Sequence, residues 1–178
     1  MLSTEATHSL VAHSLDVACV MQLLAPDEPH FPFLASLHDI GKVSAASQSK
    51  TSDAPLPDPG HDTVGLYMLR EPALARALDP VLRGWRDAER AVLLRSVCGH
   101  HGQPPRDDVT PTRPQIGTGG EEVGAELVRL MVRLFAPTAM QRMPPPGLAA
   151  LAWRLAGMCT LGRLDWLLGE VVSLRRNR

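Results

Sequence analysis

Apolar residues recur along most of the chain at the three- and four-residue intervals of an α-helix. The first such stretch, residues 7–25, is followed by Pro26, which predicts an amphipathic helix that ends before the proline. Residues 31–40 (FPFLASLHDI) are more apolar, which predicts a second, more buried helix. Gly41 follows directly and is expected to mark its end, because glycine commonly terminates helices.

The middle of the chain alternates between helical stretches and proline-bearing connections. Residues 43–60 are small, polar and interrupted by prolines, which predicts a loop. Helical spacing returns in residues 61–70, 74–82 and 88–98. Residues 102–120 hold four prolines and four glycines and predict a long second loop.

Two further stretches, residues 121–135 and 147–168, have apolar faces of helical period and are separated by the breaker MPPP. No useful length of sequence shows the alternation of a strand, and there is neither an internal repeat nor a glycine-rich phosphate loop. The predicted fold class is therefore all-α, a helical bundle with long irregular loops. A length of 178 residues fits a single domain, residues 1–178.

The charge balance excludes one way of recognising nucleic acid. The formal net charge is −1, so no global positive field would attract a polyanion, which would have to be held locally. A solvated surface explains the candidate basic residues equally well. They are Arg83, Arg86, Arg90, Arg95, Arg106 and Arg113, with Arg175, Arg176 and Arg178 in the tail.

The location of the protein is expected to be cytoplasmic. Its three cysteines, Cys19, Cys98 and Cys159, are far apart in apolar helical stretches without CxxC spacing, which predicts reduced, buried thiols. The first seven residues lack a basic start and an apolar core. No apolar run approaches the roughly 20 residues that span a membrane, so no membrane partner is expected.

Seven histidine and aspartate residues lie in or beside apolar helical stretches, where polar groups need an explanation. Neutral imidazole and carboxylate together suit divalent first-row transition metals, and seven such groups exceed the needs of one ion. Two ions are the natural interpretation. The seven residues are His13, His38, Asp39, His61, His100, His101 and Asp165.

Taken singly, each of these residues has a simpler explanation. His13 could be a half-exposed histidine on a helix face, and Asp165 could cap a helix or pair with Arg163. The neighbours His100 and His101 could belong to a loop surface. Their order along successive helices favours the metal site: His, then His-Asp, His, His-His and finally Asp.

That order, with its surrounding motifs, resembles the HD superfamily of metal-dependent phosphohydrolases. Within it, the chain is similar to the HD nuclease domain of the CRISPR-associated helicase-nuclease of type I systems. The matching motifs span nearly the whole chain. They are HSLDVACVMQLL (13–24), LHDIGKVSAASQSK (37–50), GHDTVGLYML (60–69), VCGHHGQP (97–104) and LAGMCTLGRLDWLLG (155–169).

The resemblance implies an HD-domain helical bundle that cleaves single-stranded DNA with two metal ions in type I CRISPR interference. It also implies two partners, a helicase domain or subunit and the CRISPR RNA-guided surveillance complex. By motif, one ion is held by His13, His38, Asp39 and Asp165. The second is held by Asp39, which bridges the ions, with His61, His100 and His101.

Two further residues are assigned to substrate by the same resemblance. Lys42 matches the lysine of the HDxGK motif, where it could neutralise the scissile phosphate or assist the leaving group. A plain surface lysine is the alternative. Gln48 is expected to contact substrate, although Ser47 replaces the aromatic residue that family members commonly have before this glutamine.

Other functions stay open at this point. The chain could be an HD phosphohydrolase of nucleotides or cyclic nucleotides, or a non-catalytic HD module for interactions. The histidine-rich ligand set disfavours magnesium but does not rank iron, manganese, nickel and cobalt. No Walker loop is present, so the expected helicase motor would lie on another subunit or elsewhere in a longer chain.

Overall fold

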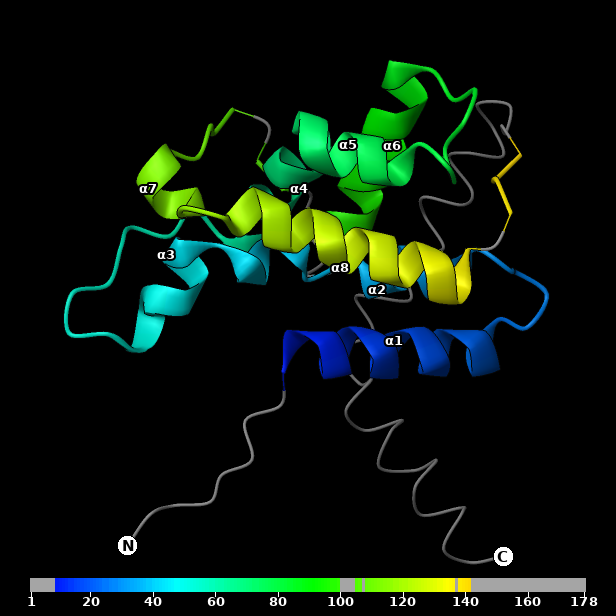
Figure 1. The fold of residues 1–178 in the computed structure, drawn as a ribbon, viewed down its shortest axis with the longest axis horizontal. Coiled ribbons are helices and arrows are strands. Elements are labelled where there is room, and N and C mark those ends of the chain that lie inside the picture. The colour runs from blue at the N-terminus through cyan, green and yellow to red at the C-terminus, as the bar shows by residue number, and fades with distance from the viewer. Residues whose placement is uncertain (1–8, 100–104, 107, 137, 142–178) are drawn as a thin grey trace, which may run out of the picture.

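The computed structural model describes residues 9–99, 105–106, 108–136 and 138–141 (Figure 1). Every regular element within these ranges is helical, which confirms the predicted all-α class. The predicted helix at residues 147–168 lies outside the described residues, and the extent of the single domain, 1–178, stays a prediction. The elements are α1 (Leu10–Leu24), α2 (Phe31–Ser36), the 3₁₀ helix η1 (Ile40–Val43), α3 (Ala45–Gln48), the 3₁₀ helix η2 (Ser49–Thr51), α4 (His61–Arg70), α5 (Pro72–Leu78), α6 (Asp87–Cys98), α7 (Arg113–Ile116) and α8 (Gly120–Phe135).

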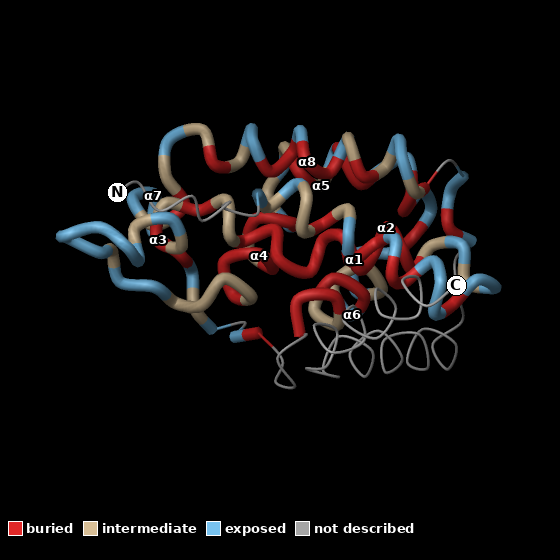
Figure 2. Tube along the Cα trace, turned by 90° about the horizontal axis from the view of Figure 1, so that it is seen from below, coloured by how far each residue is buried: buried red, intermediate tan, exposed pale blue. Residues whose placement is uncertain are grey.

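The longer helices α1 and α8 run along the length of the molecule, and in the view of Figure 1 α1 lies below α8 while α4, α5 and α6 lie above it. Helix α1 packs on α2, α5 packs on α8, and α4 packs on η1. Helix α4 is central and mostly buried (Figure 2). All six residues of α2 are buried as well, as its apolar sequence predicted. None of the described helices has both the length and the apolarity to cross a membrane.

Helix α1 is shorter than the predicted stretch of residues 7–25. Ser9 is its N-cap, because its backbone is extended and its side chain accepts a hydrogen bond from the Ala12 N–H at 3.2 Å. The cysteine thiols were predicted to be buried. This is wrong for Cys19, which is exposed on α1, and confirmed for Cys98, which is buried. Cys159 lies outside the described residues.

The second predicted helix, residues 31–40, is not continuous. Helix α2 ends at Ser36, and the chain then tightens into i→i−3 hydrogen bonds, His38 N–H to the Ala35 carbonyl at 3.2 Å and Lys42 N–H to the Asp39 carbonyl at 2.9 Å. The apolar spacing persists through this change, so periodicity alone did not reveal it. The His-Asp pair therefore lies in a tightened connection between α2 and η1, not in the last turn of an α-helix.

Gly41 does not terminate a helix, which corrects its predicted role. It lies inside η1, where a Cβ would come 1.9 Å from the carbonyl oxygen of His61 and 2.6 Å from the nitrogen of Gly65. Only a residue without a side chain permits this approach of two backbones. Gly41 thus allows η1 to lie directly against the first turns of α4.

The remaining helices deviate from prediction at capping residues. Residues 43–60 are not loop throughout, because the Ser44 side chain accepts the Ser47 N–H at 3.3 Å and starts α3. Helix α5 stops at Leu78, two residues before Pro80, which has no N–H to continue the helical hydrogen bonds. The short α7 lies within the predicted loop of residues 102–120. Helix α4 has the predicted bounds, and α6 and α8 each begin one residue early.

Candidate metal centre

Four polar side chains, from four segments, converge on the carboxylate of Asp39. His13 comes from the second turn of α1, and His38 and Asp39 come from the connection between α2 and η1. Lys42 lies in η1, and His61 is the first residue of α4. The contact of α1 with α2 and that of η1 with α4 bring these segments together. Asp39 is at the centre, with 3% of its side chain exposed.

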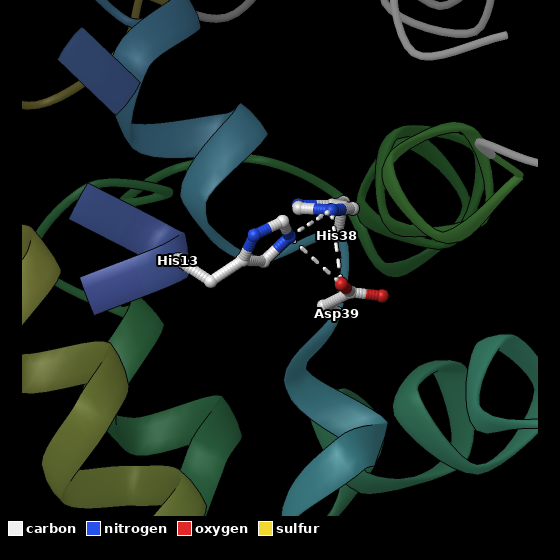
Figure 3. Close-up of side chains that lie close together, drawn as sticks. All are labelled: His13, His38 and Asp39. Carbon is white, nitrogen blue, oxygen red and sulfur yellow. Dashed lines mark hydrogen bonds and ion pairs between the residues drawn. The ribbon is translucent and has the colours of Figure 1, made fainter. Parts of the chain in front are cut away.

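His13, His38 and Asp39 form a compact triangle of potential ligand atoms (Figure 3). The Nε2 atom of His13 lies 3.0 Å from Oδ2 of Asp39, and Nε2 of His38 lies 3.2 Å from the same oxygen. The two Nε2 atoms are 3.3 Å apart. Both rings therefore point the same nitrogen at one carboxylate oxygen.

The hydrogen bond made by Nδ1 of His38 determines the protonation of its Nε2 in the neutral ring. Nδ1 lies 2.7 Å from the carbonyl oxygen of Ala35, and since a carbonyl only accepts, Nδ1 carries the proton of this hydrogen bond. In the neutral ring, Nε2 is then an unprotonated acceptor. A histidine ligand held through its other nitrogen by a backbone carbonyl is the usual arrangement in metal sites.

The triangle has the dimensions of a metal coordination site. Two ligand atoms that each lie about 2.1 Å from one ion are about 3.0 Å apart at a right angle and about 3.4 Å apart at a tetrahedral angle. The three measured separations, 3.0, 3.2 and 3.3 Å, lie within that span. Two imidazole nitrogens and one carboxylate oxygen at these separations can together bind one divalent ion.

The two oxygens of Asp39 face different partners. Oδ2 faces His13, His38 and the ammonium group of Lys42, whose Nζ is 2.6 Å away. Oδ1 lies 3.0 Å from Nε2 of His61. The exposed side-chain fractions are 10% for His38 and 14% for His61, against 36% for His13 and 42% for Lys42. Among the described residues of the cluster, His13 and Lys42 are thus the most open to solvent.

The turn before α4 aims His61 at the cluster. Gly60 has a φ of 98°, a left-handed value that favours glycine, and its N–H donates to Oδ1 of Asp58 at 2.9 Å. Oδ2 of Asp58 pairs with Nζ of Lys50 at 2.6 Å. Burial of the carboxyl group raises the pKa of Asp58, but the hydrogen bonds from Lys50 and Gly60 outweigh burial and leave the pKa lowered.

Three of the predicted ligands, His100, His101 and Asp165, lie outside the described residues. Helix α6, which ends at Cys98 just before the two histidines in sequence, is described. A Cβ at Gly65 would lie 3.6 Å from Sγ of Cys98, the last residue of α6, and 3.1 Å from the nitrogen of Gly41. Helix α6 therefore ends beside the contact of η1 with α4.

Gln48, predicted to contact substrate, makes an internal contact. Its Nε2 donates to the carbonyl oxygen of Lys42 at 2.5 Å, although the residue is exposed. This hydrogen bond ties α3 to η1 and so supports the position of Lys42. A contact between Gln48 and substrate stays a prediction.

Two contributors to the site could not be assigned from side-chain chemistry. Ala35 acts through its backbone carbonyl, for which no residue type gives a signal. Gly41 stood in the LHDIGK motif, but its position after an apolar stretch favoured a helix end over a contact between backbones. Both act by positioning other residues.

Comparison with known proteins gives one finding. Residues 27–168, most of the chain, match the family model described as "Cas3, HD domain". The match covers His38, Asp39 and His61, together with the predicted ligands outside the described residues, and begins after His13. No significant match was found among curated proteins or among solved structures.

Proposed function

Because this chain belongs to the family of Cas3 HD domains, we propose that it is a nuclease that cleaves single-stranded DNA by a two-metal mechanism during type I CRISPR interference. The family itself implies an HD-type metal-dependent nuclease that acts in a CRISPR helicase-nuclease. The strandedness of the substrate and the number of ions are the parts that we add.

The convergence of His13 and His38 on Oδ2 of Asp39 carries the proposal. The Ala35 carbonyl binds Nδ1 of His38 and leaves Nε2 to face that oxygen at 3.2 Å. Two ring nitrogens and one carboxylate oxygen thus lie within 3.3 Å of one another, at the spacing of ligands around one ion. This arrangement suits the first of two ions, for which Asp165 is the fourth proposed ligand.

The second ion is proposed on the other side of Asp39. Oδ1 faces His61 at 3.0 Å, so the carboxylate can bridge two ions through its two oxygens. We assign His100 and His101 to this second ion, which is consistent with the end of α6 lying beside the contact of η1 with α4. When bound, two such ions supply a hydroxide near neutral pH and stabilise the charge on the attacking and leaving oxygens. Iron, manganese, nickel or cobalt would suit these ligands.

The chain's own residues orient the substrate. Lys42 is 42% exposed beside the cluster, so its ammonium can pair with a phosphate oxygen or with the leaving group. The hydrogen bond from Gln48 to the Lys42 carbonyl holds η1 in place for that contact. With a formal net charge of −1, the chain must receive its strand from partners. We propose a helicase domain or subunit and the CRISPR RNA-guided surveillance complex, in the cytoplasm.

The test compares substrates and variants of the full chain. Purified protein should nick circular single-stranded DNA with Mn²⁺, Fe²⁺, Co²⁺ or Ni²⁺ and should stop when a chelator is added. Asp39→Asn should abolish cleavage, whereas Asp27→Asn, which alters an exposed aspartate between α1 and α2, should leave it unchanged. Cleavage by Asp39→Asn at the wild-type rate would indicate a contaminating nuclease.

Free nucleotides and cyclic nucleotides belong in the same assay. Hydrolysis of these compounds without cleavage of DNA would replace the proposal with a nucleotide phosphohydrolase. Metal binding without either activity would favour a non-catalytic module. Elemental analysis of the purified chain separates that last outcome from a failure to load metal.

A further inference from the structure

A cavity of about 240 Å³ lies on the side of α4 away from the residues that face η1. Its floor is formed by Thr63 and Leu66, both buried, and its rim carries two exposed arginines, Arg70 and Arg106. The segment after residue 105 closes one side, because the Arg106 N–H donates to Oγ1 of Thr63 at 3.2 Å. The remaining lining residues are Tyr67, Glu71, Val109 and Thr110.

Tyr67, the one tyrosine of the chain, is the aromatic group of this cavity. Its hydroxyl donates a hydrogen bond to Glu71, which raises the pKa of Tyr67 and limits rotation of the side chain about its stem. The residue is half-buried and packs against the core. A ring held at both ends in this way is a rigid wall that a planar ligand can stack on.

The other described aromatic residues do not offer such a wall. Phe31, Phe33 and Trp85 are buried in the core. Phe135 lines a different cavity, whose described lining residues include Glu28 but neither arginine nor lysine. Tyr67 is thus the described aromatic residue that combines an accessible surface with neighbouring cationic groups.

The two arginines at the rim are suited to a phosphate. The guanidinium of Arg106 pairs with Asp108 at 3.2 and 3.4 Å, but both side chains are largely exposed, so the pair is weak and can exchange for another anion. Arginine binds phosphate through two parallel hydrogen bonds. An aromatic wall and an exchangeable guanidinium are components of a site for single-stranded nucleic acid.

We propose that this cavity binds one base of the DNA strand, stacked on Tyr67, with the adjoining phosphate paired to Arg106. The inference rests on the proposed nuclease function and adds a substrate contact to it. Helix α4 carries both His61 and Tyr67, which lie about 9 Å apart along its axis and on different faces, so a strand held here would pass around α4 to reach Asp39.

The size of the cavity sets what it accepts. It is smaller than the roughly 300 to 1,000 Å³ that hold drug-sized ligands, so it suits a single base and not a longer stretch. Stacking tolerates every base because each has a flat face. The cavity should therefore strengthen binding of a strand without selecting its sequence.

The test measures cleavage of a short oligothymidylate by the metal-loaded full chain. Tyr67→Leu should raise KM about tenfold, the expected effect of one lost stacking contact, with kcat changed by about twofold at most. Tyr67→Phe keeps the ring and should retain the wild-type KM. Arg106→Gln should raise KM and reduce its salt dependence. Arg129→Gln, an exposed arginine paired with Glu126 away from the cavity, is the matched control and should change neither.

A spectroscopic readout accompanies the kinetics. An oligonucleotide carrying 2-aminopurine should lose fluorescence on binding the wild-type chain and Tyr67→Phe, and should keep it with Tyr67→Leu. An unchanged KM and unchanged quenching in a folded Tyr67→Leu variant, while the wild-type chain cleaves, would overturn this inference alone. Absence of cleavage by the wild-type chain with every metal would overturn the nuclease function as well. Weakened capture of the helicase partner by Tyr67→Leu, with KM unchanged, would assign the cavity to a protein contact instead.

Discussion

The ammonium group of Lys42 lies 2.6 Å from Oδ2 of Asp39, the same oxygen that His13 and His38 face. Lys42 thus occupies a position next to the proposed ion and shares a ligand atom with it. A divalent ion and an ammonium group repel at such a distance, by several kcal/mol at an effective dielectric constant of about 20. Because Lys42 is 42% exposed, it can turn toward solvent when an ion binds.

We therefore expect Lys42→Gln to bind metal more tightly and to cleave more slowly. Removal of the competing charge should lower the Kd for Mn²⁺ by about three- to tenfold, a modest effect because the side chain is partly exposed. The rate of cleavage at saturating metal should fall on the order of a hundredfold if Lys42 stabilises charge on the phosphate. Titration calorimetry and a single-turnover assay measure the two effects separately.

Arg129→Gln is the control, since it removes one positive charge from α8, where Arg129 is exposed and pairs with Glu126. It should change the Kd for Mn²⁺ much less than Lys42→Gln does. If Lys42→Gln weakens metal binding instead, Lys42 orients Asp39 for the ion and does not compete with it.

The contact of Gly41 with α4 gives a second prediction. In Gly41→Ala the new Cβ would lie 1.9 Å from the His61 carbonyl, so η1 and α4 must separate and His61 must leave Asp39. We expect the free energy of unfolding to fall by about 3 kcal/mol or more, the upper end of overpacking, and metal affinity to fall with it. Urea unfolding with and without Mn²⁺ measures both.

Gly84→Ala separates this clash from backbone strain. Gly84 has a φ of 80° with open space around it, so alanine there should cost about 1–2 kcal/mol and leave metal affinity intact. Equal losses of stability and of metal affinity in both variants would contradict the steric role given to Gly41.

The limits of prediction from sequence are clearest around the His-Asp pair. Helices α4, α6 and α8 were predicted closely because long amphipathic stretches with caps and breakers determine them. The end of α2 was not, because a 3₁₀ turn preserves nearly the same apolar spacing as an α-helix. Helix α3 was missed, since four residues with a serine cap give too weak a signal against a proline-rich background.

The candidate site was also predictable from the sequence only in part. His13, His38, Asp39 and His61 were singled out by residue type and order, and the structure brings these four together. Whether they bind metal stays a prediction. The close approach at Gly41 is a tertiary relationship between backbones, which no local pattern specifies.

The pairing of Asp58 with Lys50 predicts a dependence of stability on pH. The pKa of Asp58 in the folded chain lies below its ordinary value of 3.8, so the ionised carboxylate stabilises the fold. This contribution is complete above pH 3.8 and is lost as the pH falls through the lower pKa of the folded state. Asp58→Asn keeps an acceptor for the Gly60 N–H but loses the charge.

The free energies of unfolding of wild type and Asp58→Asn should therefore differ near neutral pH and converge in acid below pH 3.8. Urea unfolding at a series of pH values measures the difference. A constant gap at every pH would mean that the amide disturbs the turn itself and that the charge of Asp58 contributes nothing.

The hydrogen bond from His38 to Ala35 allows the structural and metal-binding roles of this histidine to be separated. The side-chain amide nitrogen of asparagine branches at the position of Nδ1, so His38→Asn can still donate to the Ala35 carbonyl but has no group at the position of Nε2. Without metal, His38→Asn should be about 1 kcal/mol more stable than His38→Ala, which loses the bond. With Mn²⁺ at about 100 times its Kd, wild type should gain about 2.7 kcal/mol, and both variants should gain little. Thermal and urea unfolding with and without Mn²⁺ measure these differences. A full gain of stability in His38→Asn would show that Nε2 of His38 is not a ligand, and the proposed first ion would then have to be placed elsewhere.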